Sequence, residues 1–370
     1  MRMAKLCFLL FNLEPGGLQT NLLRFIEFSK GNLEITVVVK GARINTLENE
    51  YVKAGAKVHW IETGYFNLMG WYRIFQFFKG NKWDSVCDLT GNFGGVYMAL
   101  SKLAGVPNRI AYYGQTSNHF SPGFVREKYN WLVNLLVKKY STSIISNSAE
   151  ALDFFIGSNW KENNKVRIIN NGVSVSGTQL GNTNIRQELN IPAGAKMVLN
   201  VARYDKNKNQ QTILKVAEVI CKERQDVYFL LCGKDTGLLE VEINDRGLKG
   251  RCFALGNRTD IGQVLTQSNL FFFPSISEGQ PNALIEAIIC GVPFVASNIR
   301  EIKEILPGEC HGQLVSPMDV ESAKLKILEA LDGNIGYSVN SLKEFCQKNF
   351  DPEIRFREFG DAITLNKRGK

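Results

Sequence analysis

Short apolar runs rich in Val, Ile, Leu and Phe alternate along the chain with longer stretches in which apolar residues recur at helical spacing. This alternation predicts βαβ units, because strands of a parallel sheet are buried on both faces and form continuous apolar runs. In the first half we predict strands at 4–13, 34–40, 57–61, 85–89, 109–113, 143–146 and 166–169. The series restarts in the second half, at 196–201, 227–232, 252–255, 270–273 and 293–296. The chain is therefore expected to be an α/β protein with two doubly wound sheets.

A stretch rich in Gly, Ser and Thr at 172–184 is the best candidate for a linker between two domains. We place an N-terminal domain at 1–173, a C-terminal domain at 174–350, and a last helix at 351–370 that packs back on the first domain. Two such sheets that face one another leave a cleft lined by the carboxyl ends of strands, where open α/β sheets bind ligands.

The composition suits this size of fold and indicates a reducing compartment. The chain has 370 residues, 44% of them hydrophobic, which is enough for two globular cores. The apolar run at 6–13 is too short to span a bilayer and is better explained as a first buried strand. Eight cysteines are present without a CxxC pair or a histidine at metal-ligand spacing. Reduced thiols in the cytoplasm are therefore expected.

Positive charge is concentrated in the first half of the chain. Residues 1–173 contain 20 Lys and Arg against 12 Asp and Glu, whereas the remainder contains 24 of each. A basic domain favours a phosphorylated acceptor, an acidic lipid surface or a nucleic acid, although a solvated basic face gives the same count. Nucleic acid is the weakest of these partners, because no zinc, helix-turn-helix or RNP pattern occurs in this half.

A cationic loop follows the first strand of the second half. Arg203 and Lys208 lie between that strand and the next helix, where a guanidinium fork and an ammonium group would clamp a diphosphate. A solvated basic loop explains the same residues equally well.

A second loop and helix favour the clamp. The strand at 270–273 leads into a loop with Glu278, and Pro281 suits the start of a helix that carries Glu286. Backbone N–H groups of the first helical turn would bind phosphate, Glu286 would bind ribose hydroxyls, and Glu278 would face the sugar; the turn consists of Asn282, Ala283 and Leu284. The two carboxylates could instead be solvated, but the strongly apolar neighbours of Glu286 favour a function.

These residues resemble the nucleotide-sugar-binding domain of the retaining GT-B glycosyltransferases of glycosyltransferase family 4. Glu278 and Glu286 match the family's E-x7-E signature within SISEGQPNALIEA, and GVP follows. Arg203 and Lys208 match the pair that neutralises the donor diphosphate. The remaining matches are weaker: Gly233 in a VGxG-like turn, Arg258 in an LGxR-like turn that abuts the nucleobase, the Gly16-Gly17 loop, and an NGVD-like boundary element at 170–173. The resemblance implies a GT-B fold of two Rossmann-like domains.

Three positions depart from the family pattern. Gly114 stands where members often carry His, and His119, five residues later, is either the active-site imidazole or a loop residue. Ser174 replaces the Asp of NGVD, and Asp235 replaces the second glycine of VGxG.

The resemblance implies a retaining transfer from a UDP-sugar of the hexose or N-acetylhexosamine class. No Asp-x-Asp occurs, so no metal site is expected, and the cations and the helix N-terminus would stabilise the leaving diphosphate. A donor phosphate oxygen would take the acceptor proton on the same face, while Glu278 positions the sugar.

Two segments of the basic half, 65–82 and 124–140, mix aromatic residues with Lys and Arg around an apolar stripe. Such a helix fits a membrane interface, but a packed core is equally compatible. Members of the resembling family with these features often use undecaprenyl-diphosphate-linked sugars to build cell-surface polysaccharide such as O-antigen or capsule. The resemblance thus implies a saccharide or lipid-linked acceptor and a peripheral place at the cytoplasmic face of the inner membrane. A GT-B-fold nucleotide-sugar epimerase and an inert nucleotide-sugar-binding protein remain the alternatives.

Overall fold

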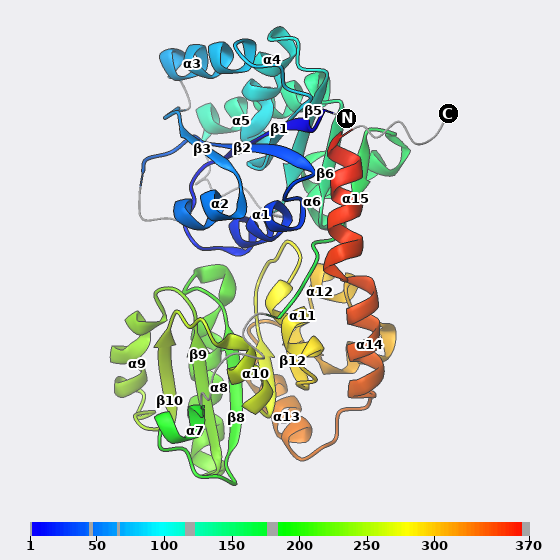
Figure 1. Cartoon of the computed structure of the whole chain (residues 1–370). Coiled ribbons are helices and arrows are strands. Elements are labelled where there is room, and N and C mark those ends of the chain that lie inside the picture. Colours follow the sequence, from blue (N-terminus) through cyan, green and yellow to red (C-terminus); the bar gives the residue numbers. More distant parts are fainter. Residues whose placement is uncertain (1, 44–46, 65–66, 115–122, 176–183, 365–370) are drawn as a thin grey trace. The chain divides into compact units, whose positions relative to one another are not determined.

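The computed structural model describes residues 2–43, 47–64, 67–114, 123–175 and 184–364. The chain forms two compact units, the first made of Met1–Gly172 with Pro352–Lys370 and the second of Val173–Asp351 (Figure 1). The division lies one residue from the boundary placed on the sequence, and the last helix belongs to the first unit. Most of the expected linker, and His119, lie outside the described residues.

The first unit contains a parallel sheet of seven strands in the order β3-β2-β1-β4-β5-β6-β7. Its elements are β1 Ala4–Leu10, α1 Gly17–Phe28, β2 Leu33–Val39, α2 Glu48–Ala54, β3 Lys57–Trp60, α3 Leu68–Lys79, β4 Ser85–Asp88, η1 Gly91–Gly94, α4 Gly95–Leu103, β5 Asn108–Tyr113, α5 Phe124–Tyr140, β6 Ser143–Ser146, α6 Ala149–Phe155, η2 Ser158–Glu162, β7 Val166–Ile168 and α15 Pro352–Thr364.

Alternate residues of each strand build two cores in this unit. Leu6 and Phe8 of β1 face α1, α2 and α15, whereas Cys7 and Leu9 face α3 and α4. A third cluster lies under α5 and α6. Phe25 of α1 contacts the rings of Phe356 and Phe359 of α15, which ties the C-terminal helix to this sheet.

The second unit contains a parallel sheet of six strands in the order β10-β9-β8-β11-β12-β13. Its elements are α7 Ile185–Glu188, β8 Lys196–Val201, η3 Lys206–Lys208, α8 Gln210–Glu223, β9 Val227–Cys232, η4 Thr236–Leu239, α9 Glu240–Asp245, β10 Cys252–Gly256, α10 Ile261–Gln267, β11 Leu270–Phe273, α11 Asn282–Ile289, β12 Phe294–Ser297, α12 Arg300–Glu304, η5 Gly308–Gln313, β13 Leu314–Val315, α13 Val320–Leu331 and α14 Val339–Asn349. Phe271 and Phe273 of β11 pack toward α11 and α14, while Phe272 packs toward α8 and α13. Helices therefore cover both faces, and the prediction of two doubly wound α/β sheets is confirmed.

Strand ends differ from the predictions at a few places. β1 stops at Leu10 rather than at residue 13, because Phe11 is exposed and the chain turns through Asn12, whose side chain accepts a hydrogen bond from Gln19. β13 was not predicted, since a strand of two residues leaves no periodic signal.

The two segments that mix aromatic and basic residues, 65–82 and 124–140, contain helices α3 and α5. Each helix has one buried side and one exposed side. In α3, Ile74 and Phe78 are buried while Leu68 and Tyr72 are exposed. In α5, Val133 and Val137 are buried, whereas three apolar side chains are exposed, Trp131, Leu132 and Leu135. Packing in the core thus explains only one side of each helix.

Candidate functional site

The cationic loop of the second unit is held in a single shape. After β8, the side chain of Asp205 accepts a hydrogen bond from the N–H of Asn207, at 2.9 Å, and begins the short helix η3. Asn209 follows with φ +56°, and its Nδ2 donates to the carbonyl oxygens of Pro274, at 2.9 Å, and Pro317, at 2.7 Å. Asn tolerates this left-handed conformation better than most residues. The loop is thereby fixed against the segment that follows β11.

Lys208 and Glu278, 70 positions apart in the chain, form a direct ion pair at this edge of the sheet. The Lys208 Nζ donates to both carboxylate oxygens of Glu278, at 2.6 and 2.7 Å. The Lys208 side chain is 22% exposed and that of Glu278 is 6% exposed. A polar ligand can therefore reach the ammonium group more readily than the carboxylate.

Arg203 lies on the same loop but is 53% exposed, with its guanidinium 3.4 Å from Asp205. An exposed and loosely paired guanidinium can reorient toward an incoming anion at small cost, because surface ion pairs contribute little stability. The loop thus offers one anchored cation and one adaptable cation.

The segment that carries Glu278 is fixed through its backbone. The N–H of Ile276 donates to the carbonyl of Asn207, at 2.7 Å, and the N–H of Glu278 donates to Oε1 of Glu301, at 3.1 Å. Glu301 is buried on the short helix α12. Glu301 was not predicted as a site residue. The sequence signal that could have pointed to it is its position in the first turn of the helix that follows β12.

Helix α11 begins where the phosphate site was expected. Pro281 occupies the N-cap position, and the first turn contains no acidic residue. The N–H groups of Asn282 and Leu284 donate to the carbonyls of Gln280, at 2.9 Å, and Pro281, at 3.1 Å. Leu284 is buried while Asn282 and Ala283 are partly exposed, and Glu286 lies one turn further along, half-buried. Binding of phosphate here by all three predicted residues stays a prediction.

Gly233 brings two strand ends into close contact. It has φ +139°, and a Cβ there would lie 2.2 Å from the carbonyl oxygen of Ala202, so only glycine fits. Its N–H donates to the carbonyl of Gly256 at 2.7 Å. Asp235 adopts φ +63°, a conformation that glycine takes easily, which explains why a glycine is common at this position in the resembling family.

Arg258 is engaged by two carboxylates. It donates to Glu188 at 2.6 and 2.9 Å and to Asp260 at 2.8 Å, and these partners raise the pKa of its guanidinium. A guanidinium held in this way presents a flat and rigid surface on which a planar base could lie. Its expected contact with the nucleobase stays a prediction.

In the first unit, the double glycine lies at the start of α1. Gly16 is the N-cap and Gly17 the first helical residue, and the first turn lacks acidic side chains. A Cβ at Gly16 would lie 2.8 Å from Oε1 of Gln19, whereas a Cβ at Gly17 would meet open space.

A buried ion pair in the same unit was not anticipated. Lys40, directly after β2, contacts Asp88, the last residue of β4, at 2.6 Å. Burial lowers the pKa of the Lys40 ammonium, and the Asp88 carboxylate opposes that shift.

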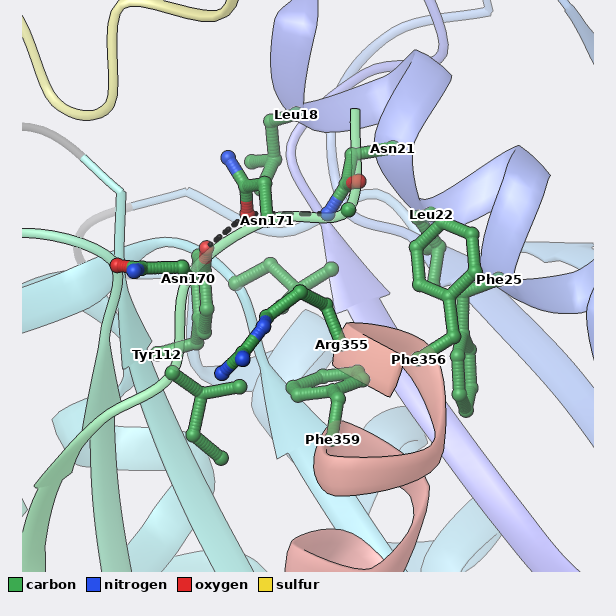
Figure 2. Close-up of a pocket in the computed structure, with 13 residues that line it drawn as sticks. Leu18, Asn21, Leu22, Phe25, Tyr112, Asn170, Asn171, Arg355, Phe356 and Phe359 are labelled. Atoms are coloured by element: carbon green, nitrogen blue, oxygen red, sulfur yellow. Dashed lines mark hydrogen bonds between the residues drawn. The ribbon is translucent and has the colours of Figure 1, made fainter. Parts of the chain in front are cut away.

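The first unit also contains a small cavity between α1, the chain around Asn171, and α15 (Figure 2). Asn171 Oδ1 accepts hydrogen bonds from Asn21 at 3.1 Å and from the Tyr112 hydroxyl at 3.0 Å. The cavity volume of about 20 Å³ has room for roughly one water molecule, so it does not hold a sugar.

Within the described part of the chain, no group of three or more His, Cys, Asp or Glu side chains is arranged to hold a metal ion. The groups described above in the second unit are cations, carboxylates and a helix N-terminus.

Comparison with known proteins finds glycosyltransferases among the similar sequences. The family described as "Glycosyl transferases group 1" matches residues 181–348. A UDP-Gal:alpha-D-GlcNAc-diphosphoundecaprenol alpha-1,3-galactosyltransferase of Escherichia coli is 24% identical over 283 residues, which cover 74% of this chain and 72% of the relative. The capsular polysaccharide biosynthesis glycosyltransferase CapH of Staphylococcus aureus is 26% identical over 310 residues, 82% and 84% of the two chains.

Solved structures show the same fold at low sequence identity. Anabaena Alr3699/HepE, in complex with UDP and glucose, superposes with a TM-score of 0.81 and 17% identity, covering 98% of this chain and all of that one. WaaG, a glycosyltransferase involved in lipopolysaccharide biosynthesis, gives a TM-score of 0.72 and 14% identity, with 98% and 100% covered. The GT-B fold inferred from the motifs is confirmed, and the family match over residues 181–348 agrees with the resemblance that the motifs carry.

Proposed function

Because residues 181–348 match the family described as "Glycosyl transferases group 1", we propose that this protein is a glycosyltransferase that moves a sugar from a UDP-sugar to a lipid-linked saccharide, with retention of configuration, in the assembly of a cell-surface polysaccharide. The sugar is a hexose or an N-acetylhexosamine. Two relatives support this substrate class by what their names state, a diphosphoundecaprenol-linked acceptor in one and capsular polysaccharide in the other.

The Lys208–Glu278 ion pair is the observation that carries the proposal for the donor. It joins a cation suited to a diphosphate with a carboxylate suited to a sugar at one strand edge, 2.6 Å apart. A UDP-sugar has a dianionic diphosphate directly beside its anomeric carbon, so both partners of the pair would touch it. The structural neighbour described with UDP-glucose supports UDP as the nucleotide.

The charges suggest a division of labour in the reaction. As the bond between the sugar and the diphosphate breaks, negative charge grows on the phosphate, where Lys208 and Arg203 stabilise it. Positive charge grows at the anomeric carbon, where Glu278 stabilises it. The leaving phosphate oxygen takes the proton of the attacking acceptor hydroxyl, and the new bond forms on the same face of the sugar. No metal ion is needed for these steps.

The acceptor would be held by the basic first unit. Trp131 is 67% exposed, with Leu132 and Leu135 beside it on the same helix, and Lys138 and Lys139 follow. An amphipathic helix with aromatic residues and lysines suits the surface of an anionic membrane, where lipid-linked acceptors reside. The helices of the described ranges are all too short or too polar to span a bilayer. Peripheral contact with the cytoplasmic face of the membrane is therefore part of the proposal.

The decisive experiment incubates the purified protein with a panel of UDP-sugars, with and without undecaprenyl-diphosphate-linked saccharides. A transferase gives product only when the acceptor is present, whereas an epimerase converts the donor alone and an inert binder converts nothing. Nuclear magnetic resonance of the product reads the anomeric configuration, and an inverted product would contradict the retaining mechanism. Glu278→Gln, which should have lower turnover, is the matched control.

Vesicle sedimentation tests the membrane contact separately. The protein should bind vesicles that contain anionic lipid and release them at high salt, and a Trp131→Ala/Leu135→Ala variant should bind less. If the variant binds vesicles as well as the wild type does, α5 is not the membrane contact, and the proposal for the donor site is unaffected.

A further inference from the structure

A sealed polar network lies at the carboxyl edge of the first unit's sheet. The side chain of Lys40 is 3% exposed and that of Asp88 is not exposed at all. The Lys40 Nζ also donates to Oγ1 of Thr90 at 2.8 Å, and it lies 4.1 Å from the centre of the Tyr97 ring. The Tyr97 hydroxyl in turn shares a hydrogen bond of 2.6 Å with Thr63, in the segment that precedes α3. The Lys40 ammonium group thus contacts the chain after β4 and helix α4, and Tyr97 extends the network to Thr63.

Stability alone does not explain such a pair. Removing two charges from water costs several kcal/mol, and well-packed apolar replacements of buried ion pairs are often neutral or stabilising. A buried pair can instead fix the positions of its neighbours, because each charged group needs hydrogen-bond partners in defined directions. Here those partners lie on the loop between β4 and α4.

The loop at 89–95, which includes η1 and the first residue of α4, is tightly constrained around this pair. Asp88 Oδ1 accepts hydrogen bonds from both the N–H and the hydroxyl of Thr90. Gly91 has φ +61°, and a Cβ at Gly94 would lie 2.9 Å from Oδ1 of Asp88. A Cβ at Gly95 would lie 2.1 Å from the carbonyl oxygen of Val133 in α5. The aspartate and the glycines thus specify one backbone path.

We propose that Lys40 and Asp88 are positioning residues for the acceptor: they hold the loop at 89–95 in the shape that receives the acceptor saccharide. The inference rests on the proposed function, since it needs an acceptor bound by the first unit. Ligands of parallel sheets bind at the carboxyl ends of strands, and this loop leaves β4 at that end. The same network reaches Thr63, so the segment before α3 and the loop are held together.

The test is a charge-free variant, Lys40→Met/Asp88→Asn, which keeps the side-chain sizes and an acceptor oxygen for Thr90. The KM for the acceptor should rise by about tenfold or more, because a loop that no longer holds its shape loses contacts with the saccharide and a loss of about 1.4 kcal/mol is a factor of ten in affinity, while the KM for the donor stays within about twofold. The matched control is Glu34→Gln/Lys57→Gln, which removes a partly exposed pair of 2.9 Å between β2 and β3, together with the 3.4 Å contact of Glu34 with Lys5, at the opposite edge of the same sheet. The control should leave both constants unchanged.

A folded charge-free variant with wild-type kinetics toward the acceptor overturns the inference. If circular dichroism shows that this variant does not fold, Thr90→Val decides instead, since it removes the hydroxyl hydrogen bonds of Thr90 with Asp88 and Lys40 and leaves the ion pair and the Thr90 N–H bond in place. The acceptor KM should rise there too, and an unchanged value overturns the inference. Failure of the proposed function would be recognised in the wild-type protein, which would then transfer no sugar to any saccharide acceptor. The inference about Lys40 and Asp88 would be wrong in that case too.

Discussion

Glu278→Gln and Lys208→Met should change the affinity for UDP in opposite directions. In the protein without donor, the Lys208 ammonium is neutralised by the Glu278 carboxylate. Binding of the diphosphate has to compete with that carboxylate. Removing the charge of Glu278 frees the lysine for phosphate, so UDP should bind more tightly even though turnover falls. Removing the lysine takes away the cation and leaves a carboxylate close to the diphosphate, so UDP should bind more weakly.

The expected sizes follow from the geometry of the pair. At 2.6 Å, Coulomb's law with an effective dielectric constant of 20 gives a gross attraction on the order of 6 kcal/mol. Desolvation offsets most of this, and couplings measured between neighbouring charged residues are about 0.5–3 kcal/mol. We expect Glu278→Gln to tighten UDP binding by about 1 kcal/mol, roughly fivefold. Lys208→Met should weaken it by about 1.5–3 kcal/mol, the range for charge-assisted hydrogen bonds.

Isothermal titration calorimetry of UDP into the wild type, both single variants and the double variant measures the coupling directly. The change in UDP binding free energy of the double variant should differ from the sum of the two single changes by about 1 kcal/mol or more. Arg203→Met serves as the control, because Arg203 does not contact Glu278 and should weaken UDP binding in the same way with or without that carboxylate. Two results would refute competition between Glu278 and the diphosphate for Lys208. One is weaker UDP binding by Glu278→Gln than by the wild type; the other is a double variant whose effect equals the sum of the single effects within about 0.5 kcal/mol.

Three further predictions concern the same domain, and one concerns metals. Glu286→Gln should raise the donor KM and leave kcat nearly unchanged, because ribose is bound alike in the ground and transition states; steady-state kinetics showing mainly lower kcat would contradict this. Glu301→Ala should lower kcat by releasing the N–H of Glu278, and Glu301→Gln, which keeps an acceptor oxygen, should restore most of it; equal loss in both would instead indicate a need for the charge. Burial, with a smaller contribution from Glu286, raises the pKa of the Cys290 thiol to about 11, so alkylation followed by mass spectrometry should be slow at neutral pH and faster as the pH approaches that value. Activity should survive a chelator, and a loss that Mn²⁺ or Mg²⁺ restores would show that the transfer needs a metal.

Most of the fold could be predicted because its signal is local. In β11 four consecutive apolar residues are all buried, which is the sequence pattern of a strand covered on both faces. Helix α5 was expected over 124–140 and has those bounds. The end of β1 was wrong because apolar character continues to Leu13, which packs in the core without being in a strand.

The candidate donor site could be predicted for a related reason. Lys208 and Glu278 are far apart in the chain, but each follows a strand of the same parallel sheet, and the carboxyl ends of such strands share one edge. Their mutual contact was not predicted, since the sequence gives neither the strand order nor the lengths of the loops in space. Glu301 and the Lys40–Asp88 pair were missed on the same grounds, because a lone charged residue next to a strand has no periodic pattern.

Both sheets carry a lysine–carboxylate pair at their carboxyl edge, with the same contact distance of 2.6 Å. What differs is access to water: the lysine is 22% exposed in the second unit and 3% exposed in the first. A ligand can displace the carboxylate from Lys208, because phosphate oxygens can reach the ammonium group as the old partner leaves. No ligand reaches Lys40 without unpacking the sheet edge, so its pair cannot exchange partners during turnover. The exposed pair can therefore take part in donor binding, whereas the sealed pair can act only through the shape that it gives to its neighbours.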